Sequence, residues 1–137
     1  MELTKYSRRT SHQVRIGNVT IGGDTPIAVQ SMTNTPTADT PSSVAQVERI
    51  AAAGAGIVRL TAQGRKEGEN LENIMLQLRQ DGCQAAIVAD IHFVPEVASI
   101  AARYVVRCES TQATTAHQTV SWRLSSHSAA REALHSA

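Results

Sequence analysis

The sequence predicts an α/β protein built on a parallel sheet, because a short apolar strand is followed by an amphipathic helix three times in succession. The repeats follow one another at a spacing of roughly thirty residues, which is typical of βαβ units. The last two repeats open with apolar runs at residues 56–61 and 86–89, the pattern of strands buried on both faces. The 137-residue chain has the length of one ordinary domain.

A β-hairpin is predicted before the repeats. Residues 14–16 and 19–21 alternate apolar and polar side chains around Gly17-Asn18, a dipeptide that suits a tight turn. Residues 27–29, Ile-Ala-Val, are predicted as the first buried strand, and hydrogen-bonding side chains follow at 30–35. Thr40 as N-cap and Pro41 as first helical residue indicate a helix that ends near Gly54.

The second and third units follow the same order. Residues 63–68 are predicted as a polar loop after the second strand. An apolar helix face comes next, with residues at i, i+3, i+4 and i+7: Leu71, Ile74, Met75 and Leu78. Pro95 starts a third helix after the strand at residue 86, and its inner positions reach Tyr104.

Polar side chains interrupt two of the apolar strands. Arg59 lies within the second strand, and Asp90 and His92 lie at the carboxyl end of the third. Ligands bind at the carboxyl ends of parallel strands, so these residues are candidates for an anion site or for chemistry. The alternatives are an internal salt bridge for Arg59 and a helix-capping role for Asp90.

Composition excludes several classes of partner. The net charge is +1 and aromatic residues make up 3%, so neither nucleic acid nor an anionic membrane is expected as a partner. The expected location is cytoplasmic. Cys83 and Cys108 lack metal-site spacing, so no metal site is predicted, and the spacing of His117, His127 and His135 matches no compact metal motif.

Three motifs in order resemble one enzyme family. They read V-Q-S-M-T-N-T from Val29, G-A-G-I-V-R-L-T-A-Q-G-R-K-E from Gly54, and V-A-D-I-H-F from Val88. Together they resemble 4-hydroxy-3-methylbut-2-enyl diphosphate synthase, the reductase of the non-mevalonate isoprenoid pathway. The resemblance runs from about Arg8 to Val105 and is greatest to the long, three-domain form of the family.

The resemblance implies that residues 1–105 are the N-terminal part of a TIM-type (β/α)8 barrel, namely a hairpin followed by the first three βα units. It implies 2-C-methyl-D-erythritol 2,4-cyclodiphosphate as the substrate, with Arg59 on the diphosphate. Asp90 and His92 would line the pocket, and its rim would carry Gln30, Ser31 and Thr33. No catalytic residue is assigned to this fragment.

The resemblance further implies parts that this chain lacks. In the full-length enzyme a [4Fe-4S] cluster would be held by three Cys and one Glu of a C-terminal domain. Flavodoxin or ferredoxin would supply electrons, and the full-length protein would be a homodimer. We expect this chain to be inactive on its own, because the cluster ligands are absent from it.

The chain changes character at residues 106–137. From residue 111 onward it is a string of small and polar residues, and we predict an aberrant, disordered tail with no fourth strand. The expected fourth strand of the family, close to V-R-I-N-P-G-N-Y, is not read in this frame. If this tail is translated in an altered reading frame, Cys108, Trp122 and His127 carry no evolved function.

A shift of reading frame accounts for this change. One permitted spelling of Cys108 to Ala116 is TGC-GAA-TCA-ACC-CAG-GCA-ACT-ACG-GCC. Regrouped from the third base, it reads R-I-N-P-G-N-Y-G. We therefore hypothesise that one nucleotide was lost near the codons of Arg107 and Cys108. The alternative is a genuine, lineage-specific tail.

Two other functions remain open at this point. The chain could belong to another phosphate-binding barrel enzyme, such as a pterin-type synthase, although the three ordered motifs speak against it. It could also be a non-enzymatic binding fragment whose exposed sheet edge pairs with another chain.

Sequencing the genomic DNA across the codons of Tyr104 to Ala116 tests the frame hypothesis. We expect one additional base, after which the frame continues into R-I-N-P-G-N-Y. A DNA sequence that encodes residues 104–116 as printed contradicts the hypothesis and leaves the lineage-specific tail.

Overall fold

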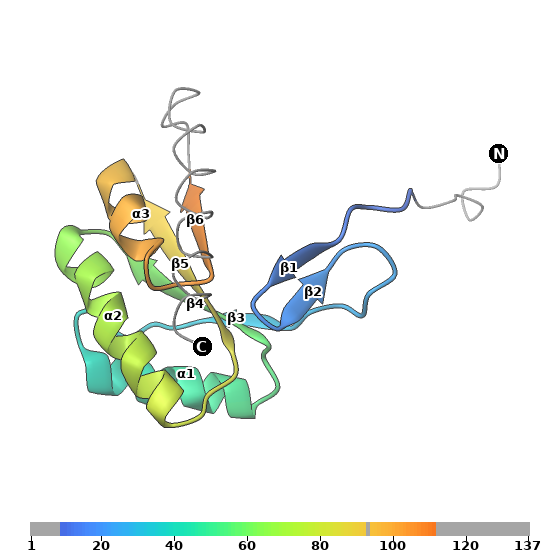
Figure 1. Ribbon diagram of the computed structural model, residues 1–137. Helices are drawn as coiled ribbons and strands as arrows, with labels where there is room; N and C mark the ends of the chain where they lie inside the picture. Colours follow the sequence, from blue (N-terminus) through green and yellow to red (C-terminus); the bar gives the residue numbers. More distant parts are fainter. Residues whose placement is uncertain (1–8, 93, 112–137) are drawn as a thin grey trace, which may run out of the picture.

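A computed structural model describes residues 9–92 and 94–111 of the chain. The elements in chain order are β1 (Val14–Ile16), β2 (Val19–Ile21), β3 (Gln30–Met32), α1 (Thr40–Ala52), β4 (Ile57–Ala62), α2 (Arg65–Gln80), β5 (Ala86–His92), α3 (Pro95–Ala101) and β6 (Arg107–Thr111). Within these residues, β1 and β2 form an antiparallel hairpin, and the other strands form a four-stranded sheet in the order β3-β4-β5-β6 (Figure 1). All three strand pairs of the sheet are parallel, as predicted.

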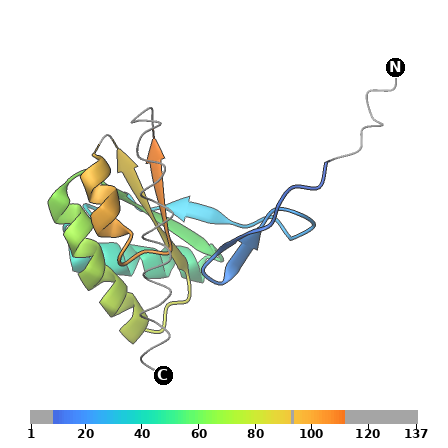
Figure 2. The ribbon, with the colours of Figure 1, turned by 45° about the horizontal axis from the view of Figure 1, so that its top comes forward.

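The three helices cover one face of the parallel sheet, and the hairpin lies away from them (Figures 1 and 2). The predicted hairpin is confirmed, with Ile16 opposite Val19 and Gly17 at a φ of 60° in the turn. Ile16 packs with Ile57 and Val88 on the sheet face opposite the helices. The two faces of the sheet are therefore distinct: one supports the helices, and the other meets the hairpin.

The main core lies between the sheet and the helices. β4 and β5 supply alternate side chains to it, because successive residues of a strand point to opposite faces. The helices complete it with the apolar stripes that their spacing predicted. Its largest fully buried members are Val47, Val58, Leu60, Leu71, Ile74, Ile87, Ile91 and Val97.

The first strand of the sheet lies later in the chain than predicted. Residues 27–29 were expected to form a buried strand, but the strand comprises Gln30–Met32, and Ile27 is 97% exposed. Parallel pairing with β4 begins where Gln30 lies beside Ile57. Among the described residues, β4 is the only partner of β3, so the segment before it lies at an uncovered edge despite its apolar sequence.

The helix boundaries differ from the prediction at three places. Asp39, not Thr40, is the N-cap of α1, and its side chain accepts a hydrogen bond from the amide of Ser42. α2 begins at Arg65, so part of the predicted polar loop is its first turn. α3 ends at Ala101, before Tyr104. Within the described ranges, none of these helices has the length and apolar character needed to cross a bilayer.

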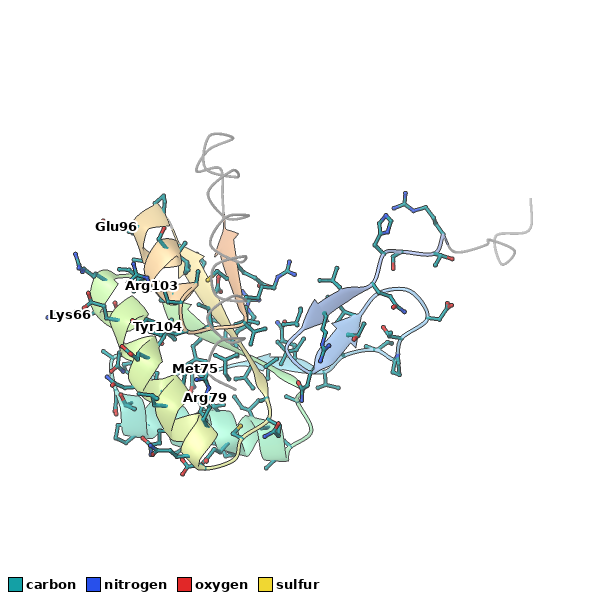
Figure 3. All side chains as sticks on the ribbon, viewed as in Figure 1. Lys66, Met75, Arg79, Glu96, Arg103 and Tyr104 are labelled. Atoms are coloured by element: carbon teal, nitrogen blue, oxygen red, sulfur yellow. The ribbon has the colours of Figure 1, made fainter. Side chains whose placement is uncertain are left out.

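The starts of α2 and α3 lie at the same end of the sheet. Figure 3 shows Lys66 and Glu96 toward this end, and Arg79 toward the opposite end of α2. Arg65 Nη1 is 4.0 Å from Glu96 Oε1 across the two helix starts. This end is where the parallel strands finish, and it is the end at which ligands bind in such sheets.

The prediction that no fourth strand follows the third helix is wrong. β6 pairs in parallel with β5, with Ala89 beside Cys108 and Asp90 beside Glu109. Its sequence, R-C-E-S-T, offers no apolar run, which is why the pattern of residues did not reveal it. The rest of the predicted tail, residues 112–137, lies outside the described residues, so its disorder stays a prediction. The altered reading frame from Arg107 or Cys108 onward, which includes most of β6, is likewise untested by the structure.

Cys108 packs against the helix-side core from β6. Its thiol lies 3.9 Å from the carbonyl oxygen of Ala98 on α3. Burial disfavours the thiolate and raises the pKa of Cys108 from its usual 9.0 to about 11. The thiol is therefore protonated at neutral pH, and the strand that carries it is docked on the core.

This docking can be measured through the reactivity of the thiol. In a Cys83→Ala variant, we expect iodoacetamide to alkylate Cys108 at pH 8 about 100-fold more slowly in the folded chain than in urea, because the thiolate reacts and its fraction falls with the raised pKa. Mass spectrometry at timed quenches gives both rates. Equal rates in the two conditions would mean that β6 is not packed on α3.

Candidate functional site

Three charged residues share the face of the sheet opposite the helices. Val58 packs in the helix-side core, so the next residue, Arg59, points to the other face. Val88 packs with the hairpin on that other face, and Asp90, two residues later, points the same way. Glu109 lies beside Asp90 in the register of β5 and β6. The sheet therefore brings one guanidinium and two carboxylates together near the carboxyl ends of its strands.

Arg59 and Asp90 form the central ion pair of this face. Arg59 Nη2 donates a hydrogen bond to Asp90 Oδ2 at 2.5 Å. The Asp90 side chain is 4% exposed, and that of Arg59 is 25% exposed. A buried carboxylate needs such a partner, because an unpaired charge in the protein interior is costly. The pair gives Arg59 a fixed position in which its side chain remains only partly exposed.

Glu109 is the second carboxylate beside Arg59. Glu109 Oε2 lies 3.3 Å from Arg59 Nε, but the geometry is not that of a hydrogen bond, since Arg59 Nε is buried without a hydrogen-bond partner among the described residues. The Glu109 side chain is 37% exposed. The contact is thus electrostatic and leaves the Nε–H without an aligned acceptor.

His92 lies at the end of β5, beside the ion pair. Its Nε2 is 3.4 Å from Asp90 Oδ1, and its side chain is 31% exposed. Asp90 Oδ1 itself is buried without a hydrogen bond among the described residues, so this contact is a proximity that becomes an ion pair only when the imidazole is protonated. The predicted residues Arg59, Asp90 and His92 therefore lie together.

The predicted rim residues are placed differently from one another. Thr33 is buried, and its amide donates a hydrogen bond of 2.9 Å to the carbonyl oxygen of Arg59. Gln30 and Ser31 lie within β3 rather than after it, and both are exposed. Ser31 lies beside Val58 in the register, which places it on the helix side of the sheet and away from the Arg59 face.

A polar network fixes the loop between β3 and α1. Gln46, 9% exposed on α1, accepts hydrogen bonds at its Oε1 from the amides of Asn34 and Thr35, at 3.0 and 3.1 Å. Its Nε2 donates to the side chain of Asn34. Thr37 Oγ1 donates to the carbonyl oxygen of Thr61 at 2.6 Å, near the carboxyl end of β4. The loop beside the charged cluster is therefore tied to both α1 and β4.

Glu109 and Gln46 were not among the predicted residues. Glu109 was missed because the chain after Val105 was read as a tail without a strand. Gln46 carried a usable signal, because its helical position falls beside Val47 on the face that the apolar spacing places inward. A glutamine on a buried helix face needs hydrogen-bond partners, and the polar loop before the helix supplies them.

Two further features lie away from this cluster. A shallow cavity of about 410 Å³ opens at the amino ends of the strands, between the hairpin turn and the ends of α1 and α2, with Asn18, Glu48, Asp81 and Cys83 in its lining. Catalysis is not expected in this cavity, since the active sites of such sheets lie at the opposite end. In the part of the chain that the structure describes, no group of three or more metal-binding side chains is found.

The arrangement suits recognition of an anion. The planar guanidinium of Arg59 matches the geometry of phosphate oxygens, and Asp90 fixes its position by accepting a hydrogen bond from Nη2. The backbone of Arg59 is also fixed, because the amide of Thr33 donates a hydrogen bond to its carbonyl oxygen. The parallel sheet, its three covering helices and a charged cluster at the carboxyl ends of the strands define the chain as part of a (β/α) barrel domain.

Comparison with known proteins agrees with this class. A family model described as the GcpE TIM-barrel domain matches residues 11–112, which include every strand and helix described above. The chain belongs to the GcpE family.

Several curated relatives share the name 4-hydroxy-3-methylbut-2-en-1-yl diphosphate synthase (flavodoxin). That of Bacteroides fragilis (strain YCH46) is 56% identical over 104 residues, which are 76% of this chain and 17% of that protein. That of Akkermansia muciniphila is 46% identical over 101 residues, 74% of this chain and 17% of that protein. That of Leptospira interrogans is 44% identical over 100 residues, 73% of this chain and 15% of that protein. The chain thus spans less than one fifth of the length of these relatives.

The role of Gln46 can be tested through stability. Replacing Gln46 with Ala leaves the amides of Asn34 and Thr35 without their acceptor, and we expect the free energy of unfolding in urea to fall by about 1–3 kcal/mol. Gln77→Ala, on the exposed face of α2, is the matched control and should stay within about 0.5 kcal/mol of the parent chain. Equal losses in the two variants would contradict the anchoring role.

Proposed function

We propose that this chain supplies the first part of the substrate site of 4-hydroxy-3-methylbut-2-enyl diphosphate synthase. That enzyme reductively opens 2-C-methyl-D-erythritol 2,4-cyclodiphosphate to 4-hydroxy-3-methylbut-2-enyl diphosphate. One observation carries the proposal: Arg59 is held on the inner face of the barrel segment by buried Asp90, near the strand ends where the substrate of such a domain binds.

Arg59 would bind the diphosphate through charge-assisted hydrogen bonds, which are stronger than neutral ones. Asp90 would orient the guanidinium, because its buried carboxylate accepts the hydrogen bond from Arg59 Nη2 at Oδ2. His92 would face the substrate from the end of the same strand. Thr33 would hold the Arg59 backbone. Gln30 would share the sheet face of Arg59 but lies beside Ile57, two residues nearer the amino ends of the strands.

The redox part of this reaction does not fit the chain itself. The whole chain contains two cysteines, fewer than the three that the resemblance implies for a [4Fe-4S] cluster, and the described residues hold no group of three or more metal-binding side chains. The cluster would therefore lie in another part of a full-length protein, and this chain would be inactive alone.

The remaining partners are proposed on the same basis. Flavodoxin as electron donor is supported by the names of the relatives, which include flavodoxin, and ferredoxin is the alternative. A cytoplasmic location and a homodimer of the full-length protein complete the proposal. The proposed substrate-binding residues of this chain come from one sheet and the loop beside it. They would therefore depend neither on the location nor on the dimer.

The anion site can be tested with inorganic pyrophosphate and the 137-residue chain. We expect Arg59→Met to weaken pyrophosphate binding by about ten- to a hundredfold, because a hydrogen bond to a charged group contributes about 1.5–3 kcal/mol. Calorimetric titration at low ionic strength measures both dissociation constants. Arg79→Met, at the opposite end of α2, removes the same charge and should leave the affinity unchanged. An Arg59→Met chain that binds as well as the parent chain would disprove the site.

A further inference from the structure

Asn34 lies at the carboxyl ends of the strands, close to Arg59 in the sheet. Met32 is beside Arg59 in the register of β3 and β4, and the amide of Thr33 donates to the carbonyl oxygen of Arg59. Asn34 follows directly and is exposed, whereas Thr33 is buried. The loop thus offers a polar side chain at the end of the sheet where Arg59 and Asp90 form their ion pair.

The hydrogen bonds of Gln46 determine which end of the Asn34 carboxamide is left free. Backbone amides only donate, so the Gln46 atom that meets the amides of Asn34 and Thr35 must be the oxygen, Oε1. The other end of Gln46, Nε2, only donates, so the Asn34 atom that accepts from it must be the oxygen, Oδ1. Asn34 Nδ2 remains, and within residues 9–92 and 94–111 it has no hydrogen-bond partner.

We propose that the Asn34 carboxamide is a second hydrogen-bond donor of the anion site, and that Gln46 holds it in the orientation in which Nδ2 can donate. This inference rests on the proposed function, because it adds a group to the site that contains Arg59. Asn34, Gln46 and Arg59 all precede Arg107, so the altered reading frame hypothesised from that point onward does not affect them.

Arg59 alone offers an anion an incomplete set of donors. Its Nη2 already donates to Asp90, and its side chain is only 25% exposed. A diphosphate carries several acceptor oxygens, and an acceptor that loses water without gaining a donor weakens binding. Asn34 Nδ2 can supply a donor while the bond between Arg59 and Asp90 stays in place. Because Asn34 Oδ1 is occupied by Gln46, the oxygen of the carboxamide does not compete for the anion.

The loop that carries Asn34 is held in place by both neighbouring helices. Ser43 of α1 donates from its Oγ to the carbonyl oxygen of Pro36 at 3.1 Å. Asn70 of α2 donates from its Nδ2 to the carbonyl oxygen of Thr37 at 2.8 Å. A donor on a segment that is already ordered loses little conformational entropy when a ligand binds. The loop therefore presents Asn34 in a preorganised position.

Asn34→Asp separates a binding role from a structural one. The new side chain can still accept from Gln46 Nε2, but its other oxygen cannot donate and repels an anion. We expect pyrophosphate to bind this variant of the 137-residue chain at least about tenfold more weakly than the parent chain, because a hydrogen bond to a charged group is lost. Calorimetric titration measures both dissociation constants. The midpoint of urea unfolding should stay unchanged, because the bond to Gln46 is kept.

Asn18→Asp is the matched control. It makes the same change of charge at an exposed residue by the hairpin turn, at the amino ends of the strands. At about 0.1 M ionic strength such a distant charge is largely screened, so the affinity should change less than about twofold.

Gln46→Glu tests the orienting role. The new carboxylate can accept from the amides of Asn34 and Thr35 but cannot donate to Asn34 Oδ1, so we expect the carboxamide to turn and Nδ2 to donate inward. In the parent chain, pyrophosphate should shift the Asn34 Nδ2–H resonances in NMR spectra, with the dissociation constant found by calorimetry. In Gln46→Glu the same resonances should no longer respond. A response like that of the parent chain would contradict the orienting role.

The donor role is overturned if the Asn34 Nδ2–H resonances of the parent chain do not shift, or if Asn34→Asp binds pyrophosphate as tightly as the parent chain. If Arg59→Met still weakens binding in that case, the anion site stands and only the role of Asn34 fails. If Arg59→Met has no effect either, the proposed function fails as well.

Discussion

A guanidinium on the middle of a parallel strand is the constraint on which the site depends. Arg59 cannot lie on the inner face of β4 without a carboxylate close by, because its charge is largely withdrawn from water. The register of the sheet provides that carboxylate from the neighbouring strand, where Asp90 lies beside Thr61, two residues beyond Arg59. The offset of two residues between Arg59 and Asp90 therefore follows from the register of the two parallel strands.

The same constraint explains why the two faces of the sheet differ so strongly. On the helix side, β4 and β5 present only apolar side chains to the core. On the other face, apolar residues occupy the amino ends of the strands beneath the hairpin, and charged residues occupy the carboxyl ends. Along β4 and β5 this face thus changes from apolar residues at the amino ends to charged residues at the carboxyl ends. The hairpin covers the apolar end.

Much of this organisation could be predicted from the residues. The hairpin, the order of strands and helices, and the closeness of Arg59 to Asp90 follow from alternation, helical spacing and the rule for parallel strand ends. The first sheet strand could not be placed, because the residues in register with β4 are Gln30–Met32, while Ile27 and Val29 of the apolar segment stay exposed at an edge. The start of α2 was missed since its N-cap, Gly64, offers no side-chain signal.

Glu109 shows a different limit of sequence reasoning. A strand of mixed polar residues has no apolar periodicity, and its place is decided by hydrogen bonds to β5 that no local pattern records. The position of Glu109 beside Asp90 could therefore not be predicted until the register of β5 and β6 was known. Family membership, by contrast, was accessible from three short motifs, because each of them covers a strand end together with the residues that follow it.

The anchoring of the loop after β3 has a consequence for motion. Its amides at Asn34 and Thr35 are held by a side chain of α1 rather than by a turn of the loop itself. Hydrogen exchange at these two amides then requires the Gln46 side chain to release them, so their protection depends on a residue of the helix and not on the loop. The loop beside Arg59 is thus restrained from two sides, by Gln46 of α1 and by the bond from Thr37 to the carbonyl oxygen of Thr61 on β4.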